Sequence, residues 1–339
     1  MKKILSIFNI ILIILSSIWS CLFIWIHQPI NITLAITLII AWLALSFICI
    51  FKISLFNLNS IVFRIIYYIF FIIILFVFFS LVPSNNREWD PEVSKIATYQ
   101  IKDGKVEVHN VRNFIWKNDY EHTTQWETRT YNINQIQSVD LVISHFIQGP
   151  IAHAFVTFGF ENGEYLAFSI EVRREKNEKF STIGGFFRQY ELAIVIGDEN
   201  DLIYTRSNIR NERVYIYPIN MRKDQIQKLF LLYLNKANSL SEHPRWYNTW
   251  ISNCTTIIFD LVEYTVGKDY IPRDYRVILP GLLPNYLYDI DQLDHKYTLD
   301  EWKKMAFLNP HILDFNSSLS EDNEDKNKFS KKIRSGWPN

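Results

Sequence analysis

The stretch "HAFVTFGFENGEYLAFSIEV" (residues 153–172) decides the class of fold. Its two halves are rich in aromatic and β-branched residues, which favour strands. The dipeptide Asn162-Gly163 between them is the strongest short-range sign of a hairpin turn. The stretch therefore predicts two antiparallel strands joined by a tight turn.

Other β-rich runs surround this hairpin, and helical patterns follow them. Apolar residues at helical spacing predict helices over 223–240 and 254–267, and Thr298 is a predicted N-cap for a third helix. This order of strands and then helices favours an α+β domain with an antiparallel sheet. The other predicted strands lie within residues 105–116, 123–133, 139–144, 190–196 and 213–219.

The first part of the chain, residues 1–82, is almost uncharged and holds three apolar runs, 4–26, 30–50 and 61–82. Each run has the roughly 20 residues that a helix needs to cross a bilayer. A cleaved signal peptide fits the first run poorly, because the run is too long and no small-residue cleavage site precedes the second run. The sequence therefore predicts three transmembrane helices.

Basic residues near these runs indicate their orientation. Lys2 and Lys3 precede the first run, Lys52 and Arg64 flank the loop after the second, and the link at 27–29 has neither Lys nor Arg. By the positive-inside rule the N-terminus is cytoplasmic. Three crossings then place the rest of the chain on the opposite side of the membrane.

Composition divides that remainder into three parts. Residues 83–95 resemble a linker, residues 96–312 form an α+β domain large enough to bury a core, and residues 313–339 are predicted to be disordered. The whole chain has 35 basic and 35 acidic residues, so its charge indicates no nucleic-acid partner. There is no CxxC, HExxH, clustered histidine or glycine-rich phosphate loop, so we expect no metal and no cofactor.

Cys254 is the only cysteine after residue 50, and Cys21 and Cys49 lie inside predicted membrane helices. It therefore has no partner for a structural disulfide. It begins a predicted helix, where backbone N–H groups would favour a thiolate and could bind an oxyanion. A buried, inert cysteine and a reactive one both fit this position.

Among the histidines, His153 stands out because it begins the hairpin strand among apolar neighbours. It is the candidate base, and a core histidine is the alternative. Glu171 is a candidate third group. A two-residue turn would place Val172 opposite His153 and Glu171 opposite Ala154, so Glu171 would point to the other face unless a bulge intervened.

Further candidates surround the cysteine or carry positive charge. Asn253 and Thr255 are predicted to support the oxyanion site at the helix start. Arg173, Arg188 and Tyr247 are predicted substrate contacts. The arginines could equally be scaffold residues or contacts to anionic headgroups, and the same holds for the others of this set, Arg112, Arg206 and Arg210.

Six motifs, in order, carry a family resemblance over roughly residues 87–265: "VRNF" (111–114), "TYNINQIQSVDL" (130–141), "AHAFVTFGFENGEYLAFSIEVRRE" (152–175), "GGFFRQYEL" (184–192), "DENDLIYTRSNIR" (198–210) and "YNTWISNCTT" (247–256). Together they resemble the N-terminal periplasmic domain of the Bacteroides-type lipoprotein N-acyltransferase, Lnb. That acyltransferase carries its membrane part after the domain, whereas the apolar runs here come before it.

The order of histidine and then cysteine, with "NC" opening a helix, is also similar to the circularly permuted papain-like group. That group includes lecithin:retinol acyltransferase relatives and permuted NlpC-type hydrolases. The resemblance implies a permuted papain-like fold, His153 as base, Cys254 as nucleophile and a thioester acyl-enzyme.

These observations predict a membrane-anchored periplasmic thiol acyltransferase or acyl hydrolase. The resemblance implies the bacterial inner membrane as its location and a phospholipid or lipoprotein as its substrate. Two alternatives stay open: a cell-wall peptide amidase or peptidase with the same dyad, and a periplasmic binding domain without catalysis.

Overall fold

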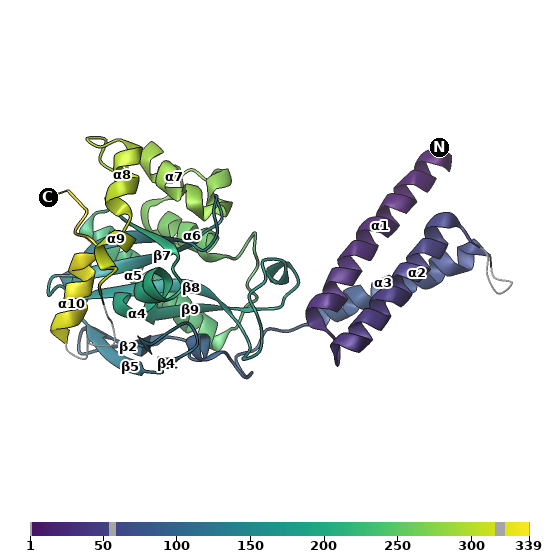
Figure 1. The fold of residues 1–339 in the computed structure, drawn as a ribbon, viewed down its shortest axis with the longest axis horizontal. Helices are drawn as coiled ribbons and strands as arrows, with labels where there is room; N and C mark the ends of the chain where they lie inside the picture. Colours follow the sequence, from purple (N-terminus) through teal and green to yellow (C-terminus); the bar gives the residue numbers. More distant parts are fainter. Residues whose placement is uncertain (1, 54–58, 316–322, 339) are drawn as a thin grey trace. The chain divides into compact units, whose positions relative to one another are not determined.

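A computed structural model of the chain divides into two compact units (Figure 1). The first unit consists of Met1–Pro83 and Phe180–Tyr190, and the second of Ser84–Lys179 and Glu191–Asn339. The structure describes residues 2–53, 59–315 and 323–338.

The first unit contains three helices that are long and apolar enough to cross a membrane, as predicted: α1 (Lys2–His27), α2 (Ile32–Phe51) and α3 (Ser60–Ser80). Some of their polar side chains pair with one another. The Tyr67 hydroxyl lies 2.7 Å from Ser16 Oγ and 2.8 Å from Ser17 Oγ. Such pairs are expected between membrane helices, because lipid offers no other hydrogen-bond partner.

The segment Phe180–Tyr190 packs against these helices. The Arg188 guanidinium donates hydrogen bonds to the carbonyl oxygens of Phe78 (3.0 Å) and Phe79 (3.3 Å) at the end of α3, and lies 4.6 Å from the centre of the Phe78 ring. Cations stabilise the carbonyl end of a helix. Arg188 is thus held by the end of α3, and its prediction as a substrate contact has no support here.

The second unit is built on a sheet with strand order β1-β2-β9-β8-β7-β6-β10, to which β5 adds by pairing with β2. Neighbouring strands run antiparallel except β2 and β9. This confirms the predicted α+β class. The strands are β1 (Thr98–Lys102), β2 (Lys105–Arg112), β5 (Trp126–Tyr131), β6 (Ile136–His145), β7 (His153–Phe160), β8 (Tyr165–Arg173), β9 (Glu191–Gly197) and β10 (Arg213–Pro218), with β3 (Ile115–Trp116) and β4 (His122–Thr123) in a separate small hairpin.

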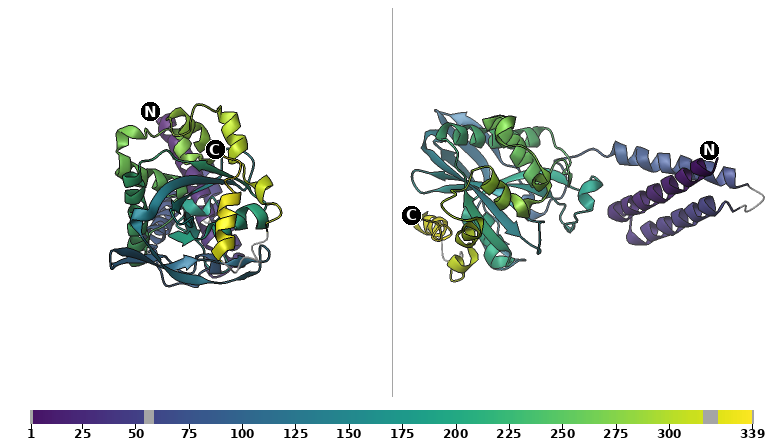
Figure 2. Two further views of the ribbon diagram at one scale, coloured as in Figure 1. Left: turned by 90° about the vertical axis from the view of Figure 1, so that its left-hand side faces the viewer. Right: turned by 90° about the horizontal axis from the view of Figure 1, so that it is seen from above.

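Helices cover both faces of this sheet (Figure 2), because its strands are apolar on both sides. In β6, Leu141 and Ile143 enter one core, while Val142 between them enters the other. On the first face lie α5 (Lys223–Glu242), α6 (Cys254–Val266), α7 (Leu283–Asp289) and α8 (Leu299–Ala306). On the second lie α4 (Glu199–Tyr204), the π-helical turn η4 (Thr205–Ile209), α9 (Asn309–Ile312) and α10 (Asn323–Lys332). Short 3₁₀ turns are η1 (Pro91–Val93), η2 (Ile133–Gln135), η3 (Gly184–Phe186), η5 (Lys268–Tyr270), η6 (Tyr275–Ile278) and η7 (Pro280–Leu282).

The central hairpin forms as predicted, but its register differs by one residue. Gly159 pairs with Tyr165, so the turn has three residues and ends at Gly163, whose φ of +83° needs glycine. The predicted pairing of His153 with Val172 is therefore wrong. The shift puts Glu171 on the same face as His153 without any bulge in this strand pair.

The predicted disorder of residues 313–339 is also wrong where the structure describes them. In α10 and just after it, Phe329 and Ile333 are buried against the second face of the sheet. Arg334 donates hydrogen bonds to Asp140 (2.9 Å) and Glu199 (2.9 Å). The segment is polar on average, but these three side chains supply enough specific contacts to order it. Residues 316–322 lie outside the described part.

Most of the predicted linker, 83–95, is part of the second unit, and Arg173 explains why. This guanidinium is buried and donates to the carbonyl oxygens of Val93 (3.0 Å) and Ser94 (2.8 Å). It also lies 4.2 Å from the centre of the Trp89 ring. Arg173 therefore fixes the start of the domain, and its role as a substrate contact stays a prediction that these contacts do not support.

Candidate functional site

Cys254 is the first residue of α6, and Asn253 is the reason why the helix begins there. Asn253 Oδ1 accepts hydrogen bonds from the N–H groups of Thr255 and Thr256, both at 2.9 Å. An asparagine cap satisfies donors that have no partner within the helix. Asn253 does not accept a hydrogen bond from the N–H of Cys254, the first residue of the helix. The predicted support from Asn253 and Thr255 thus takes the form of a helix cap.

The Cys254 sulfur is buried and lies at the open end of the hairpin. The His153 side chain and the backbone N–H of Ala154 lie close enough to it to lower the pKa of the thiol. Thr255 Oγ1 is 3.7 Å away. Among the described pairs of β7 and β8, the ladder ends at Val156 and Phe168. The strands separate beyond that pair, so the start of β7 is open to the sulfur.

The second side of the His153 ring contacts β8. His153 Nε2 lies 2.7 Å from Ser169 Oγ and 3.3 Å from Glu171 Oε1. Ser169 in turn donates a hydrogen bond of 2.6 Å to Glu171. With Nε2 directed at these two residues, Nδ1 is the ring nitrogen left for Cys254. The structure therefore brings together Cys254, His153 and Glu171, the three residues predicted to form the site.

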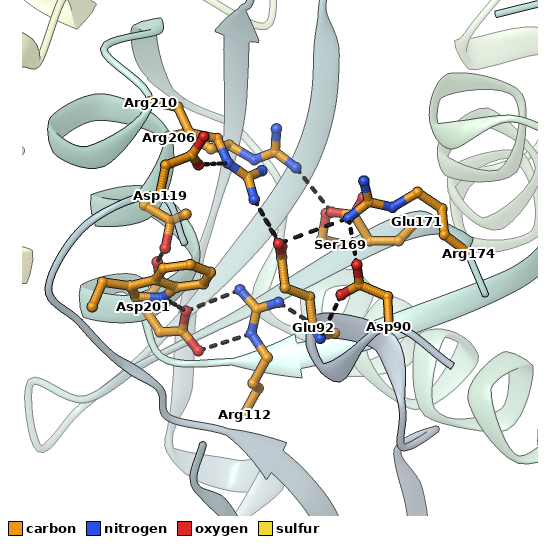
Figure 3. Close-up of polar contacts among 12 residues, drawn as sticks. Asp90, Glu92, Arg112, Asp119, Ser169, Glu171, Arg174, Asp201, Arg206 and Arg210 are labelled. Carbon is orange, nitrogen blue, oxygen red and sulfur yellow. Dashed lines mark hydrogen bonds and ion pairs between the residues drawn. The ribbon is translucent and has the colours of Figure 1, made fainter. Parts of the chain in front are cut away.

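A buried arginine lies behind Glu171 (Figure 3). Arg206, from η4, donates to Glu171 Oε1 at 2.9 Å and to Glu212 at 3.4 Å. Nearby, Arg112 forms a two-pronged ion pair with the fully buried Asp201, with distances of 2.8 and 2.9 Å. Arg112 and Arg206 are thus part of the scaffold that fixes the carboxylate, one of the two interpretations that the sequence left open.

The charges of the site favour a thiolate and an imidazolium. Burial alone would raise the pKa of Cys254, but the hydrogen bond and positive charge of His153 outweigh it and lower this pKa. Burial and Arg206 oppose protonation of His153, yet Glu171 and Cys254 raise its pKa to about 9. Burial disfavours the Glu171 carboxylate, but His153 and Arg206 hold its pKa well below the ordinary value.

Two tyrosines complete the surroundings of the sulfur. Burial, and then the charges of Cys254 and Glu171, raise the pKa of Tyr247, which places this predicted contact beside the site. Tyr233, from α5, is fully buried, and its hydroxyl has no hydrogen-bond partner among the described residues. Burial and the charge of Cys254 raise its pKa as well. Ser169 and Tyr233 were not predicted, because one resembles any strand serine and the other any apolar helix residue.

The described residues contain no group of three His, Cys, Asp or Glu side chains that could hold a metal ion. A buried thiol beside a histidine is an arrangement that can support the chemistry of an activated thiol with an adjacent proton carrier.

The three apolar helices and the domain that follows them define a membrane protein that carries a periplasmic domain. Residues 122–281 match the family model described as the Lnb N-terminal periplasmic domain, which supports the resemblance of this domain to the Lnb type. The matched segment contains His153, Ser169, Glu171 and Cys254. Comparison with curated proteins gave no match, and comparison with solved structures gave none either. The permuted papain-like fold stays a prediction.

Proposed function

We propose that the chain is a membrane-anchored thiol acyltransferase or acyl hydrolase that acts on a phospholipid or lipoprotein ester. The observation that carries this proposal is the buried thiol of Cys254 beside His153, whose ring contacts Ser169 (2.7 Å) and Glu171 (3.3 Å) on its other side. A packing cysteine needs no such arrangement. We also propose that the domain faces the periplasm from the bacterial inner membrane, with the N-terminus in the cytoplasm.

In the first half-reaction the Cys254 thiolate attacks the ester carbonyl and forms a carbon–sulfur bond. The backbone N–H of Cys254 stabilises the oxyanion. The carbon–oxygen bond then breaks, and the leaving alcohol takes a proton from the His153 imidazolium. The product is a thioester on Cys254 and a neutral imidazole on His153.

In the second half-reaction an amine or water attacks this thioester. His153 takes the proton of the attacking group, and the thiolate leaves as the new amide or acid forms. The enzyme thereby returns to its starting charges. Ser169 and Glu171 keep the ring of His153 in place through both halves, since they contact the nitrogen that faces away from the sulfur.

A long-chain acyl thioester probe tests the proposal. In the full-length protein we expect an acyl adduct on Cys254, located by mass spectrometry. Cys254→Ser should abolish the adduct and His153→Ala should reduce it strongly, while the exposed His295→Ala should keep it. Iodoacetamide provides the control for accessibility. If Cys254 reacts with iodoacetamide only after unfolding, it is a packing residue and the proposal is wrong.

A further inference from the structure

Two loops meet at the candidate site. The loop 146–152 leads directly into His153, and the loop 246–253 leads directly into Cys254. Because α6 and β7, which these loops lead into, contact each other, the ends of both loops lie side by side. Both carry large apolar side chains exposed to solvent: Phe146, Ile147, Ile151, Trp250 and Ile251.

The loop before Cys254 is a closed turn. Asn248 and Ser252 exchange backbone hydrogen bonds of 3.1 and 3.0 Å. Asn248 Oδ1 accepts from the N–H groups of Trp250 (3.0 Å) and Ile251 (3.2 Å) at its tip. The tip side chains are 66% and 78% exposed, respectively. A turn whose backbone groups are satisfied internally can enter an apolar medium without losing hydrogen bonds to water.

Both loops are also fixed in place. Asn253, the cap of α6, donates from Nδ2 to the carbonyl oxygen of Thr249 at 2.7 Å. The N–H of Gly281 donates to the carbonyl oxygen of Pro150 at 2.9 Å. A side chain at 281 would meet that oxygen at 2.9 Å and His145 Cε1 at 2.8 Å, so this approach requires glycine. The exposed apolar residues are thus held in position by the scaffold.

We propose that these two loops form a membrane-contacting surface, and that their occupant is the lipid bilayer that the chain itself spans. Neither loop contains Asp, Glu, Lys or Arg, which matches the uncharged zone beneath the headgroups. The second unit begins at Ser84, just after α3 ends at Ser80, so the tether to the membrane is short. The consequence for the site, which rests on the proposed function, is that an acyl chain reaches Cys254 from the bilayer without crossing water.

Photocrosslinking tests this surface separately from catalysis. The full-length Cys254→Ser variant is reconstituted in liposomes of phosphatidylethanolamine and phosphatidylglycerol, with p-benzoylphenylalanine in place of Ile251. The matched control carries the crosslinker in place of Tyr120, which is 91% exposed. Tyr120 also lies on a turn whose N–H groups bond to an asparagine, Asn118, but charged residues flank it.

We expect phospholipid adducts at position 251 and none at position 120. Adding Trp250→Ser should lower the yield at 251 by about tenfold, since each large apolar side chain contributes at least that factor to partitioning. Equal yields at both positions, or no lipid adduct at 251, would overturn the proposal. So would crosslinking to an added lipoprotein in place of lipid. Lipid adducts at 251 in this variant, together with no acyl adduct on Cys254 in the wild-type protein, support the surface and overturn the proposed function.

Discussion

At the scale of single residues, Ser169 and Glu171 determine the behaviour of His153. The serine hydroxyl accepts from His153 and donates to Glu171, while Arg206 binds the same carboxylate oxygen. A carboxylate shared in this way stays ionised at neutral pH and supports the imidazolium. This arrangement determines the pH range in which the proposed proton donor is charged.

The first prediction concerns Glu171→Gln. His153 has a pKa of about 9, so acylation by the thioester probe should fall as the pH rises through 9, where the imidazolium loses its proton. Without the carboxylate, this alkaline limb should move to lower pH. The measurement is the pH profile of acylation, with the exposed Glu161→Gln as the matched control. An alkaline limb that stays in place in Glu171→Gln contradicts the assigned role.

From the sequence, His153 and Cys254 were candidates, because strand position and helix start are local properties, and the family resemblance paired them. Ser169 could not be predicted, since its contact with His153 depends on the register of the hairpin, which a single extra turn residue changes. The contacts of Arg173 with Val93 and Ser94 could not be predicted for a related reason, because they join segments far apart in the sequence.

At the scale of elements, α6 depends on its cap. Asn253→Ala removes the acceptor for the N–H groups of Thr255 and Thr256 and the donor to Thr249. We predict a loss of about 1 kcal/mol in the free energy of unfolding, together with slower acylation of Cys254. Thr298→Ala, which removes the cap of α8, should cost a similar free energy and leave acylation unchanged. If Asn253→Ala and Thr298→Ala are acylated at the same rate, the cap of α6 has no role in the reaction of Cys254.

A second prediction at this scale concerns the C-terminal segment. Arg334→Met leaves the buried Asp140 and Glu199 without their positive partner, which should destabilise the protein by about 3–5 kcal/mol. Burial raises the pKa of Asp140 to about 6 even beside Arg334, and the loss of that cation raises it further, so the destabilisation should shrink as the pH falls toward 6 and the carboxyl of the variant takes up a proton. Guanidinium unfolding at several pH values measures this loss, with the exposed Lys331→Met as control. A loss in the free energy of unfolding that does not change with pH would contradict this prediction.

The elements differ in how far the sequence alone predicts them. The helices over 223–240 and 254–267 were predicted because long amphipathic periods are strong local signals, and α5 and α6 confirm them. Four of the described helices, α4, α7, α9 and α10, were not predicted. The first three are short and the last has few apolar residues, so their local signals are weak and they depend on packing against the rest of the domain.

At the scale of the whole molecule, the prediction is one of topology. The basic residues near the helix ends predict a cytoplasmic N-terminus, so alkaline phosphatase fused after Asp90 should be active. A fusion after Lys52 should be inactive. Activity is measured in intact cells, with fusion protein levels compared by immunoblot. The reverse pattern would put the domain in the cytoplasm and remove the periplasmic substrates from consideration.

The ion pairs of Arg334 also bear on biosynthesis. Asp140 and Glu199 belong to the sheet and to α4, but their counter-charge is translated after every strand of the domain. Until that segment has been translated, the incomplete domain would bury acidic groups without their positive partner, so folding would stabilise it little. A polypeptide destined to pass through a translocation channel benefits from this delay, because it stays extended during export and folds once the segment has arrived.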